Sequence, residues 1–272
     1  MNTFMKIVLT IAGSDPSGGA GIQADLKTFA AFGVYGVSAI TAVTVQNTKG
    51  VDRVSPLAAD LVEAQIEAVA GDVTVHATKI GMLATAAIVE AVTAAIDELD
   101  LPLVVVDPVL RSTSGSPLLD ADGVRALVSE LLPRARIVTP NVGEAEALTG
   151  RRIDSLDEAR DAARRIRELG PRAVVITGGH ARLLGGGDPS HVLDLLLDDT
   201  GFHESRVLRV DVGPTHGTGC TFASAVAAGL ALGRALPDAV SRAQAYVAGA
   251  LANRPAIGRG RAVADHFWER SR

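Results

Sequence analysis

Thr215-His216-Gly217-Thr218-Gly219-Cys220 is followed directly by an alanine-rich run, residues 221–228 (TFASAVAA). The two glycines permit unusual backbone angles and close approach, and the run behind them favours a helix. This loop is therefore predicted to lead straight into a helix N-terminus. Backbone N–H groups without an intrahelical acceptor, together with the positive end of the helix dipole, make such a place suited to an anion. A phosphate group is the expected ligand.

Cys220 falls in the first turn of that helix, where a thiolate is favoured and the pKa of the thiol is expected to fall. A second interpretation is a plain helix cap, in which Thr218 or Thr215 satisfies the backbone and Cys220 is a small core residue. A third makes Cys220 a hydrolase nucleophile with His180 or His216 as its base. A lone cysteine near histidines is common by chance, so the third interpretation is the weakest. The loop by itself does not decide between the first two.

Composition limits the class of protein. The 272 residues are 47% hydrophobic and only 3% aromatic. A core of Ala, Val, Leu and Ile suits parallel strands covered by helices. We expect one domain over residues 1–272, with residues 1–4 and about 256–272 peripheral. The formal net charge of −5 argues against a general nucleic-acid binder, because no basic excess exists to displace counterions. Small-molecule substrates are expected instead.

The single cysteine excludes an internal disulfide. No stretch has the order of a signal peptide, and no apolar run is long enough to cross a bilayer. We therefore expect a cytoplasmic protein without membrane partners.

Strand-like and helix-like segments alternate along the chain. Strands are predicted at residues 6–12, 36–47, 77–82, 103–107, 136–139 and 173–177, and a pair of strands at 192–197 and 207–211 around a turn at 198–201. Helices are predicted after residue 21 and at 58–70, 84–99, 122–132, 144–148, 156–169, 220–233 and 238–253. This order predicts an α/β fold in three layers, with a mostly parallel sheet covered by helices on both faces. The glycine-rich segment 181–189 is predicted to form a small flap.

Two helices show a clear inward face. In the first, Ile22, Leu26, Phe29 and Ala30 are expected to face the core, with Asp25 and Lys27 off that face. In the helix at 156–169 the inward residues are Ala159, Ala162, Ala163 and Ile166. The helix after Cys220 is apolar nearly all round and should be buried.

Polar residues stand where the predicted strands end. They are Asp15, Gln46, the neighbours of Met82, Asp107, Asn141 and Thr177. Ligands of open α/β sheets bind beyond the carboxyl ends of the strands. These side chains are therefore expected to gather along one edge of the sheet.

Asp107 and Glu144 form the best acidic pair at that edge. Two carboxylates from separate strand ends suit a hydrated Mg²⁺ that also contacts substrate phosphates. The alternative is structural: Asn141 caps a helix and Glu144, three residues on, completes a capping box. The two roles are compatible.

Known nucleotide motifs do not explain the first glycine-rich loop. Residues 19–24 (GAGIQA) match the dinucleotide pattern G-x-G-x-x-A, but the first glycine lies seven residues past Ala12, and Gln46-Asn47 stand where an acid should end the second strand. The pattern G-x-x-x-x-G-K-[ST] is absent from the sequence. If the protein binds a nucleotide, the phosphates of that nucleotide are expected outside this loop.

Taken together, the motifs resemble those of hydroxymethylpyrimidine/phosphomethylpyrimidine kinases of thiamine biosynthesis, in the ribokinase-like superfamily. They are residues 13–28 (GSDPSGGAGIQADLKT), 46–48 (QNT), 79–82 (KIGM), 107–109 (DPV), 139–141 (TPN), 178–180 (GGH) and 216–220 (HGTGC). The resemblance spans about residues 6–255 and implies a ribokinase-like sandwich. It also implies two successive phosphorylations with ATP and Mg²⁺, the first on the hydroxymethyl of 4-amino-5-hydroxymethyl-2-methylpyrimidine and the second on the monophosphate. A homodimer is implied as well.

The resemblance also implies roles for single residues. The pyrimidine pocket is expected at Gly13, Asp25, Gln46, Met82 and Val109. The ATP phosphates are expected at Asp107, Asn141, Glu144 and Thr177, with Asp107 and Glu144 serving the magnesium. The catalytic anion hole is expected at Gly217, Thr218, Gly219 and Cys220, with backbone N–H groups stabilising the transferring phosphoryl group. Many ribokinase relatives have an aspartate base where Cys220 stands, so Cys220 either deprotonates the alcohol or only positions it.

Three departures from the family pattern stand out. Many relatives have lysine at the position of Thr177. The threonine side chain cannot supply a cation to the ATP phosphates. Arg111, Lys79 and Lys49 are the candidates to replace it. Pro214 stands where asparagine is usual and Leu110 where methionine is common, and both are expected to be tolerated.

Two alternatives stay open at this point. One is a kinase of the same fold that acts mainly on pyridoxine or pyridoxal. The other is a non-catalytic pyrimidine-binding regulator, favoured only by Thr177.

Overall fold

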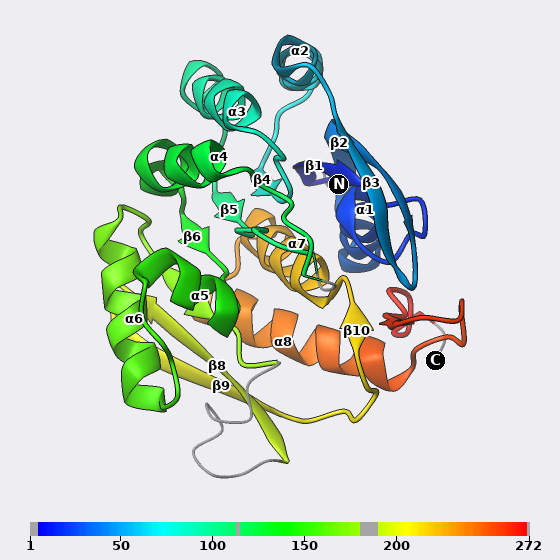
Figure 1. Ribbon diagram of the computed structural model, residues 1–272, viewed down its shortest axis with the longest axis vertical. Coiled ribbons are helices and arrows are strands. Elements are labelled where there is room, and N and C mark those ends of the chain that lie inside the picture. Colours follow the sequence, from blue (N-terminus) through cyan, green and yellow to red (C-terminus); the bar gives the residue numbers. More distant parts are fainter. Residues whose placement is uncertain (1–4, 113–114, 180–189, 271–272) are drawn as a thin grey trace.

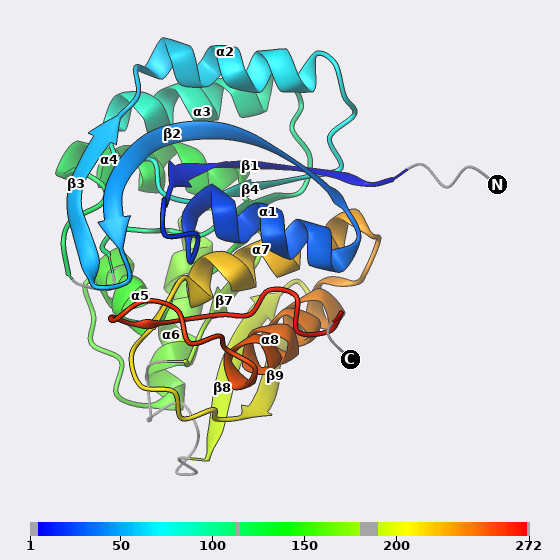
Figure 2. The same cartoon turned by 90° about the vertical axis from the view of Figure 1, so that its right-hand side faces the viewer.

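The computed structural model describes residues 5–112, 115–179 and 190–270. Figure 1 shows a central twisted sheet with helices on both faces, and Figure 2 shows the same layers from the side. The sheet has nine strands in the order β3-β2-β1-β4-β5-β6-β7-β8-β9. The predicted three-layer α/β fold is confirmed.

Short, buried strands make up the centre of the sheet, and within the residues that the structure describes its parallel part has six strands in all. They are β1 (Ile7–Ser14), β2 (Tyr35–Asn47), β4 (Ala77–Ile80), β5 (Val104–Val106), β6 (Ile137–Val138) and β7 (Val174–Ile176). Antiparallel strands close both edges: β3 (Gly50–Pro56) pairs with β2, and β8 (His191–Asp198) pairs with β7 and with β9 (Gly201–Leu208). Parallel strands in this order direct their carboxyl ends to one edge of the sheet.

Helices cover the sheet in two groups. One face carries α2 (Ala59–Ala70), α3 (Ala86–Glu98), α4 (Ala121–Ala126), α5 (Val142–Thr149) and α6 (Leu156–Glu168). The other carries α1 (Gly21–Phe32), α7 (Thr218–Ala231) and α8 (Leu236–Ala252). After α4 the chain continues as a π-helical turn (Leu127–Leu131) and a 3₁₀ turn (Leu132–Arg134). No helix in these described stretches is both long and apolar enough to cross a membrane.

Most predicted elements are confirmed within a few residues. The inward face of α6 is as expected, and α7 is buried continuously from Thr221 to Ala231. The prediction for α1 is wrong at Asp25, which is fully buried, because its carboxylate meets the ammonium of Lys79 from β4. Leu26 and Ala30 are only half-buried.

Three strands were not predicted. They are β3 and a small separate parallel pair, β10 (Thr215–His216) with β11 (Ala262–Val263). The partner of β11 is β10, which lies directly before α7. Residues 262–266 are therefore not peripheral, and Val263, Ala264 and His266 are buried. The predicted flap at 181–189, and His180 beside it, lie outside the described residues.

Candidate active site

A cavity of about 450 Å³ opens at the carboxyl ends of the parallel strands. The strand-end residues expected there all line it: Asp15, Gln46, Met82, Asp107, Asn141 and Thr177. So do Gly13, Val109, Glu144 and the loop residues 217–220. Segments far apart in the sequence thus meet at the predicted edge of the sheet.

The N-terminus of α7 faces this cavity without a side-chain cap. Gly217 is the N-cap, with φ of 77°, and a Cβ there would come within 1.8 Å of the Gly19 carbonyl oxygen. Only glycine fits such a position. The capping role proposed for Thr218 or Thr215 is not observed. The amides of the first turn, which have no intrahelical acceptor, are therefore open to a ligand.

The first glycine-rich loop differs, because its amides already hold an anion. The carboxylate of Asp15 accepts hydrogen bonds from the backbone N–H groups of Ser17 (2.8 Å), Gly19 (3.2 Å) and Ala20 (2.8 Å). Burial raises the pKa of Asp15, but the hydrogen bonds from His216, Ser17 and Ala20 together lower it by more. The pKa therefore lies below its usual value. This loop has little capacity left for a phosphate.

Cys220 is half-buried at the start of α7. The expectation that its pKa falls is wrong. Desolvation by the surrounding protein raises the pKa of the Cys220 thiol to about 12, although the Lys79 ammonium acts in the opposite direction. Asp107 and Asp25 raise it further. Cys220 is therefore a neutral thiol near neutral pH.

His216 does not serve Cys220 as a base. Its Nε2 lies 3.1 Å from Oδ2 of Asp15 and 2.7 Å from Nε2 of Gln46. The hydrolase interpretation requires a nucleophile bonded to its base. The described residues do not provide that arrangement.

Asp107 and Glu144 are an acidic pair, and Lys79, whose charge acts on Asp107, is itself paired with Asp25. Desolvation, followed by Asp25, raises the pKa of Asp107 to about 6 even though Lys79 lowers it. Desolvation and the charge of Asp107 raise the pKa of Glu144 to about 8. The predicted capping box is present too: Asn141 Oδ1 accepts from the Glu144 N–H, and Glu144 Oε2 accepts from the Asn141 N–H.

This donor set fits a magnesium ion. Asp107 raises the pKa of Glu144, and two ionised carboxylates on one cavity become more stable when a divalent cation lies between them. Hard oxygen ligands of this kind are what Mg²⁺ prefers. The capping role is confirmed, and the magnesium role stays a prediction that is compatible with it.

Asp25 does not lie on the cavity wall, in contrast to the other residues expected to bind the pyrimidine. Its Oδ2 accepts from Lys79 Nζ at 2.9 Å and Thr10 Oγ1 at 2.6 Å, and its Oδ1 accepts from Ser224 Oγ at 2.7 Å. Both Asp25 and Lys79 are fully buried beneath the cavity. Asp25 thus has a structural partner in place of an open contact surface.

A second cavity, of about 280 Å³, shares one wall with the first. Asn141, Thr177, Thr218 and Gly219 line both cavities. Its other walls are mostly apolar and come from β8, β9, α7 and α8, including Val192, Val207, Phe222, Val247 and Leu251. An apolar chamber joined to an anion-binding loop suits a nucleotide with its base in one chamber and its phosphates in the other.

The three cations considered as replacements for a lysine at residue 177 lie in different places. Arg111 lines the first cavity, whereas Lys79 is buried beneath it and Lys49 lines only a small side pocket. Arg209, which the sequence analysis missed, lines the second cavity and donates to the carbonyl of Gly179 at 3.0 Å. Asp194, also missed, accepts from the Gly178 N–H at 2.9 Å, and burial raises its pKa to about 7. Asp194 lies inside β8 and Arg209 directly follows β9, and neither belongs to a motif that would mark it as a site residue.

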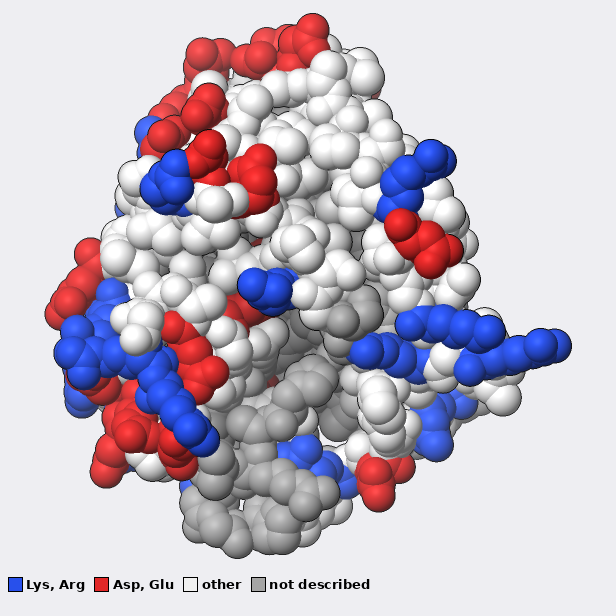
Figure 3. All heavy atoms as spheres, in the orientation of Figure 1, with Lys and Arg blue, Asp and Glu red and all other residues white. Residues whose placement is uncertain are grey.

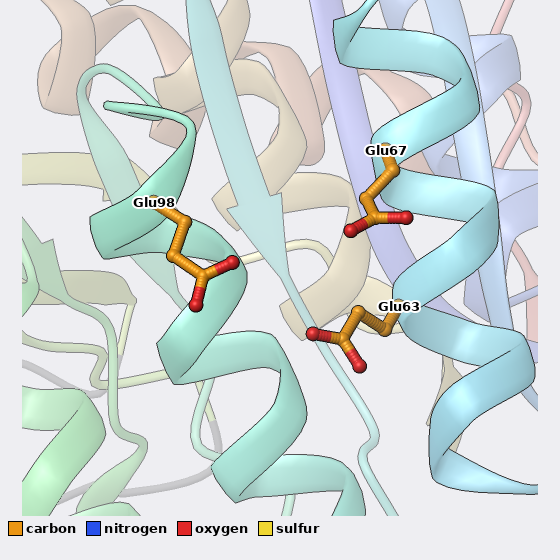
Figure 4. Close-up of side chains that lie close together, drawn as sticks. All are labelled: Glu63, Glu67 and Glu98. Atoms are coloured by element: carbon orange, nitrogen blue, oxygen red, sulfur yellow. The ribbon is translucent and has the colours of Figure 1, made fainter.

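A three-carboxylate group lies outside both cavities, between α2 and α3. Figure 4 shows Glu63 and Glu67 on α2 facing Glu98 on α3, and Figure 3 shows acidic side chains over this end of the molecule. Glu67 and Glu98 are exposed, so water solvates their charges. This group therefore does not identify a metal site.

The family model described as phosphomethylpyrimidine kinase matches residues 15–265. A Rhizobium meliloti protein named hydroxymethylpyrimidine/phosphomethylpyrimidine kinase is 46% identical over 265 residues, which are 96% of this chain and 97% of that protein. The thiamine biosynthesis bifunctional protein ThiED of Geobacter sulfurreducens is 44% identical over 260 residues, which are 96% of this chain but only 52% of that protein. The chain thus spans about half the length of that bifunctional relative.

Among solved structures, the pyridoxal kinase from Staphylococcus aureus in complex with AMP-PCP and pyridoxal is similar to this chain. The TM-score is 0.86 at 36% identity, and the match covers 97% of this chain and 94% of that one. The same fold there holds a nucleotide analogue together with a small ring substrate.

Proposed function

Because this chain belongs to the phosphomethylpyrimidine kinase family, we propose that it transfers phosphate from ATP to 4-amino-5-hydroxymethyl-2-methylpyrimidine and then to the monophosphate, as a step of thiamine biosynthesis. The observation that carries the proposal is the uncapped N-terminus of α7, which opens into the same cavity as Gln46 and Asp107. An anion-binding loop, a ring-binding amide and an acidic pair in one chamber are the parts that phosphoryl transfer to a ring alcohol requires.

The nucleotide is assigned to both cavities. The apolar second chamber takes the base, and the shared wall of Asn141, Thr177, Thr218 and Gly219 directs the phosphates toward α7. The amides of residues 217–220 stabilise charge on the phosphoryl group as it moves, because they are fixed before the reaction begins. Thr177 contributes a hydroxyl and no charge.

Asp107 and Glu144 are the residues that would hold Mg²⁺. When bound, the ion neutralises phosphate charge and orients the phosphate chain. The capping box fixes Glu144 through Asn141, so the carboxylate stays at the start of α5 when ligands exchange.

The acceptor ring is assigned to the other end of the first cavity. Gln46 has donor and acceptor atoms for an aminopyrimidine edge, and Met82 with Val109 supplies an apolar wall. Cys220 positions the hydroxymethyl group as a neutral thiol. Its raised pKa makes it a poor general base.

The protein is proposed to act in the cytoplasm as a homodimer. Val43 and Val45 on β2 are 48% and 45% exposed, and β2 belongs to a curved antiparallel hairpin at the edge of the sheet. Exposed apolar side chains on an edge hairpin suit pairing with a second copy.

A coupled ATP assay tests the proposed reaction. With Mg²⁺ and folded protein we expect turnover on the hydroxymethylpyrimidine and on its monophosphate. Turnover on neither compound would contradict the proposal.

Pyridoxal is the second candidate substrate, because the Staphylococcus aureus neighbour is a pyridoxal kinase of the same fold. Competition between the two rings, compared as kcat/KM, decides which is preferred. We expect the aminopyrimidine to be preferred, and a higher kcat/KM for pyridoxal would reverse the assignment.

A further inference from the structure

The side-chain amide of Gln46 has two contacts in which donor and acceptor are not paired correctly. Its Nε2 is placed 2.7 Å from Nε2 of His216, and its Oε1 is placed 3.1 Å from Oγ1 of Thr44. His216 Nε2 also lies 3.1 Å from Asp15 Oδ2, and Thr44 Oγ1 lies 2.9 Å from the Ser14 carbonyl. The oxygen and nitrogen of an amide have nearly the same size, so the hydrogens rather than the shape decide which end faces His216.

With the amide nitrogen toward His216, two contacts fail. The Nε2 of His216 would have to accept from Gln46, which leaves its lone pair facing the carboxylate of Asp15. The hydroxyl of Thr44 would face two acceptors with one hydrogen. Buried polar groups that meet without a hydrogen between them are costly.

With the amide oxygen toward His216, every contact is matched. His216 carries its hydrogen on Nε2 and shares it between Asp15 and Gln46. Thr44 donates to the Ser14 carbonyl and accepts from the Gln46 amide. Asp15 supports this choice because its carboxylate is held as an anion by the loop amides and by the Ser17 hydroxyl, at 2.7 Å from Oδ1.

The imidazole is also fixed in place. His216 belongs to β10, which pairs with Val263 of β11. A Cβ on Gly19 would lie 3.1 Å from His216 Cδ2 and 2.8 Å from Val263 Cγ1, so the ring packs directly on the first loop. A side chain held on both sides can impose its hydrogen-bonding pattern on Gln46.

We propose that the Asp15–His216 pair is a specificity device, which holds the Gln46 amide with its oxygen toward His216 and its nitrogen toward Thr44. The substrate ring then meets an acceptor on the His216 side and a donor on the Thr44 side. A ring nitrogen beside an exocyclic amine matches this order, with the amine toward His216. A pyridine ring without that amine leaves the amide oxygen unmatched and is disfavoured. His216 and Asp15 are positioning residues, and the ring preference rests on the proposed function.

Long-range ¹H–¹⁵N NMR of the ligand-free protein tests the hydrogen placement without any activity. The His216 signals are identified as those that His216→Phe removes from the six histidines. We expect the Nε2–H form of the ring in the wild-type protein. A neutral ring with its hydrogen on Nδ1 would overturn the proposal.

Kinetics tests the consequence for the substrate. His216→Phe is expected to lower kcat/KM for the aminopyrimidine about 10- to 100-fold, the range for a lost hydrogen bond to a polar or charged partner. The effect on pyridoxal is expected to be less than about threefold, and KM for ATP should stay unchanged. His216→Gln, which restores an N–H donor, should recover most of the lost discrimination.

His203→Phe is the matched control, because it removes an imidazole that lines neither cavity and should leave the ratio of the two substrates unchanged. Equal losses on both rings in His216→Phe would overturn the specificity role. If the wild-type protein phosphorylates neither ring, the proposed function fails, and the NMR result still decides the hydrogen arrangement.

Discussion

Two buried carboxylates of this protein have opposite surroundings. Asp25 is fully buried and meets the Lys79 ammonium and two hydroxyl groups, whereas Asp107 is 5% exposed and lies near another carboxylate, Glu144. Burial lowers the pKa of Lys79, but Asp25, Cys220 and Asp107 together raise it more, so that the pKa lies above its usual value. Asp107 and Glu144 both have raised pKa values. The difference separates a pair completed within the fold from a pair that the proposed magnesium ion would complete.

The largest expected effect comes from breaking the completed pair. Lys79→Met leaves the buried Asp25 charge with hydroxyl partners alone, and we expect a loss of about 3–5 kcal/mol in the free energy of unfolding. Urea denaturation measures it. The double change of Lys79→Met with Asp25→Leu should recover part of the loss, because no unpaired charge remains. A single-variant loss below about 1 kcal/mol would show that the pair is not a structural unit.

The acidic pair should respond in the opposite way. Asp107→Asn removes a like charge from Glu144, so unfolding at pH 8 should be unchanged or should require more urea. Turnover with ATP is expected to fall about 10²- to 10³-fold, the range for one lost electrostatic contact to the transition state. Denaturation and the coupled assay on the same sample measure both. Glu63→Gln, in the exposed group on α2, is the control and should change neither.

A further effect is expected from pH in the absence of magnesium. The pKa values of Asp107 and Glu144 rise from 3.8 to about 6 and from 4.5 to about 8 on folding. The folded state therefore binds these protons more tightly than the unfolded state does. The stability that this binding contributes is fully present below about pH 4 and is lost as the pH rises toward 8. We expect the melting temperature to fall over that range by about 2–4 °C for each kcal/mol lost.

Added Mg²⁺ should reverse part of this fall at pH 8 and have little effect at pH 5, because only the ionised pair binds the cation. Asp194, with its pKa of about 7, contributes in the same range. Asp107→Asn keeps Asp194 and is the comparison that isolates the acidic pair. A magnesium effect of equal size in Asp107→Asn would place the ion elsewhere.

The sequence predicted the layers and the edge of the sheet because strand and helix periodicity and turn residues are local signals. The capping box was predictable for the same reason, since Asn141 and Glu144 are three residues apart. The strands β10 and β11 have two residues each and carry no recognisable pattern.

The errors at Asp25 and Cys220 have a different cause. Asp25 was placed outward because charges are rarely buried, but its partner Lys79 is 54 positions away in the sequence. The pKa of Cys220 was expected to fall from helix position alone, whereas desolvation, the largest cause, raises it. Local patterns do not report long-range partners or burial.

The pairing of β10 with β11 has a consequence for synthesis of the chain. The loop before α7 is fixed by Ala262 and Val263, which leave the ribosome well after all nine strands of the main sheet. A nascent chain can therefore assemble its core and still hold His216 loosely. The loop before α7 is therefore expected to reach its final geometry only after the main sheet has formed.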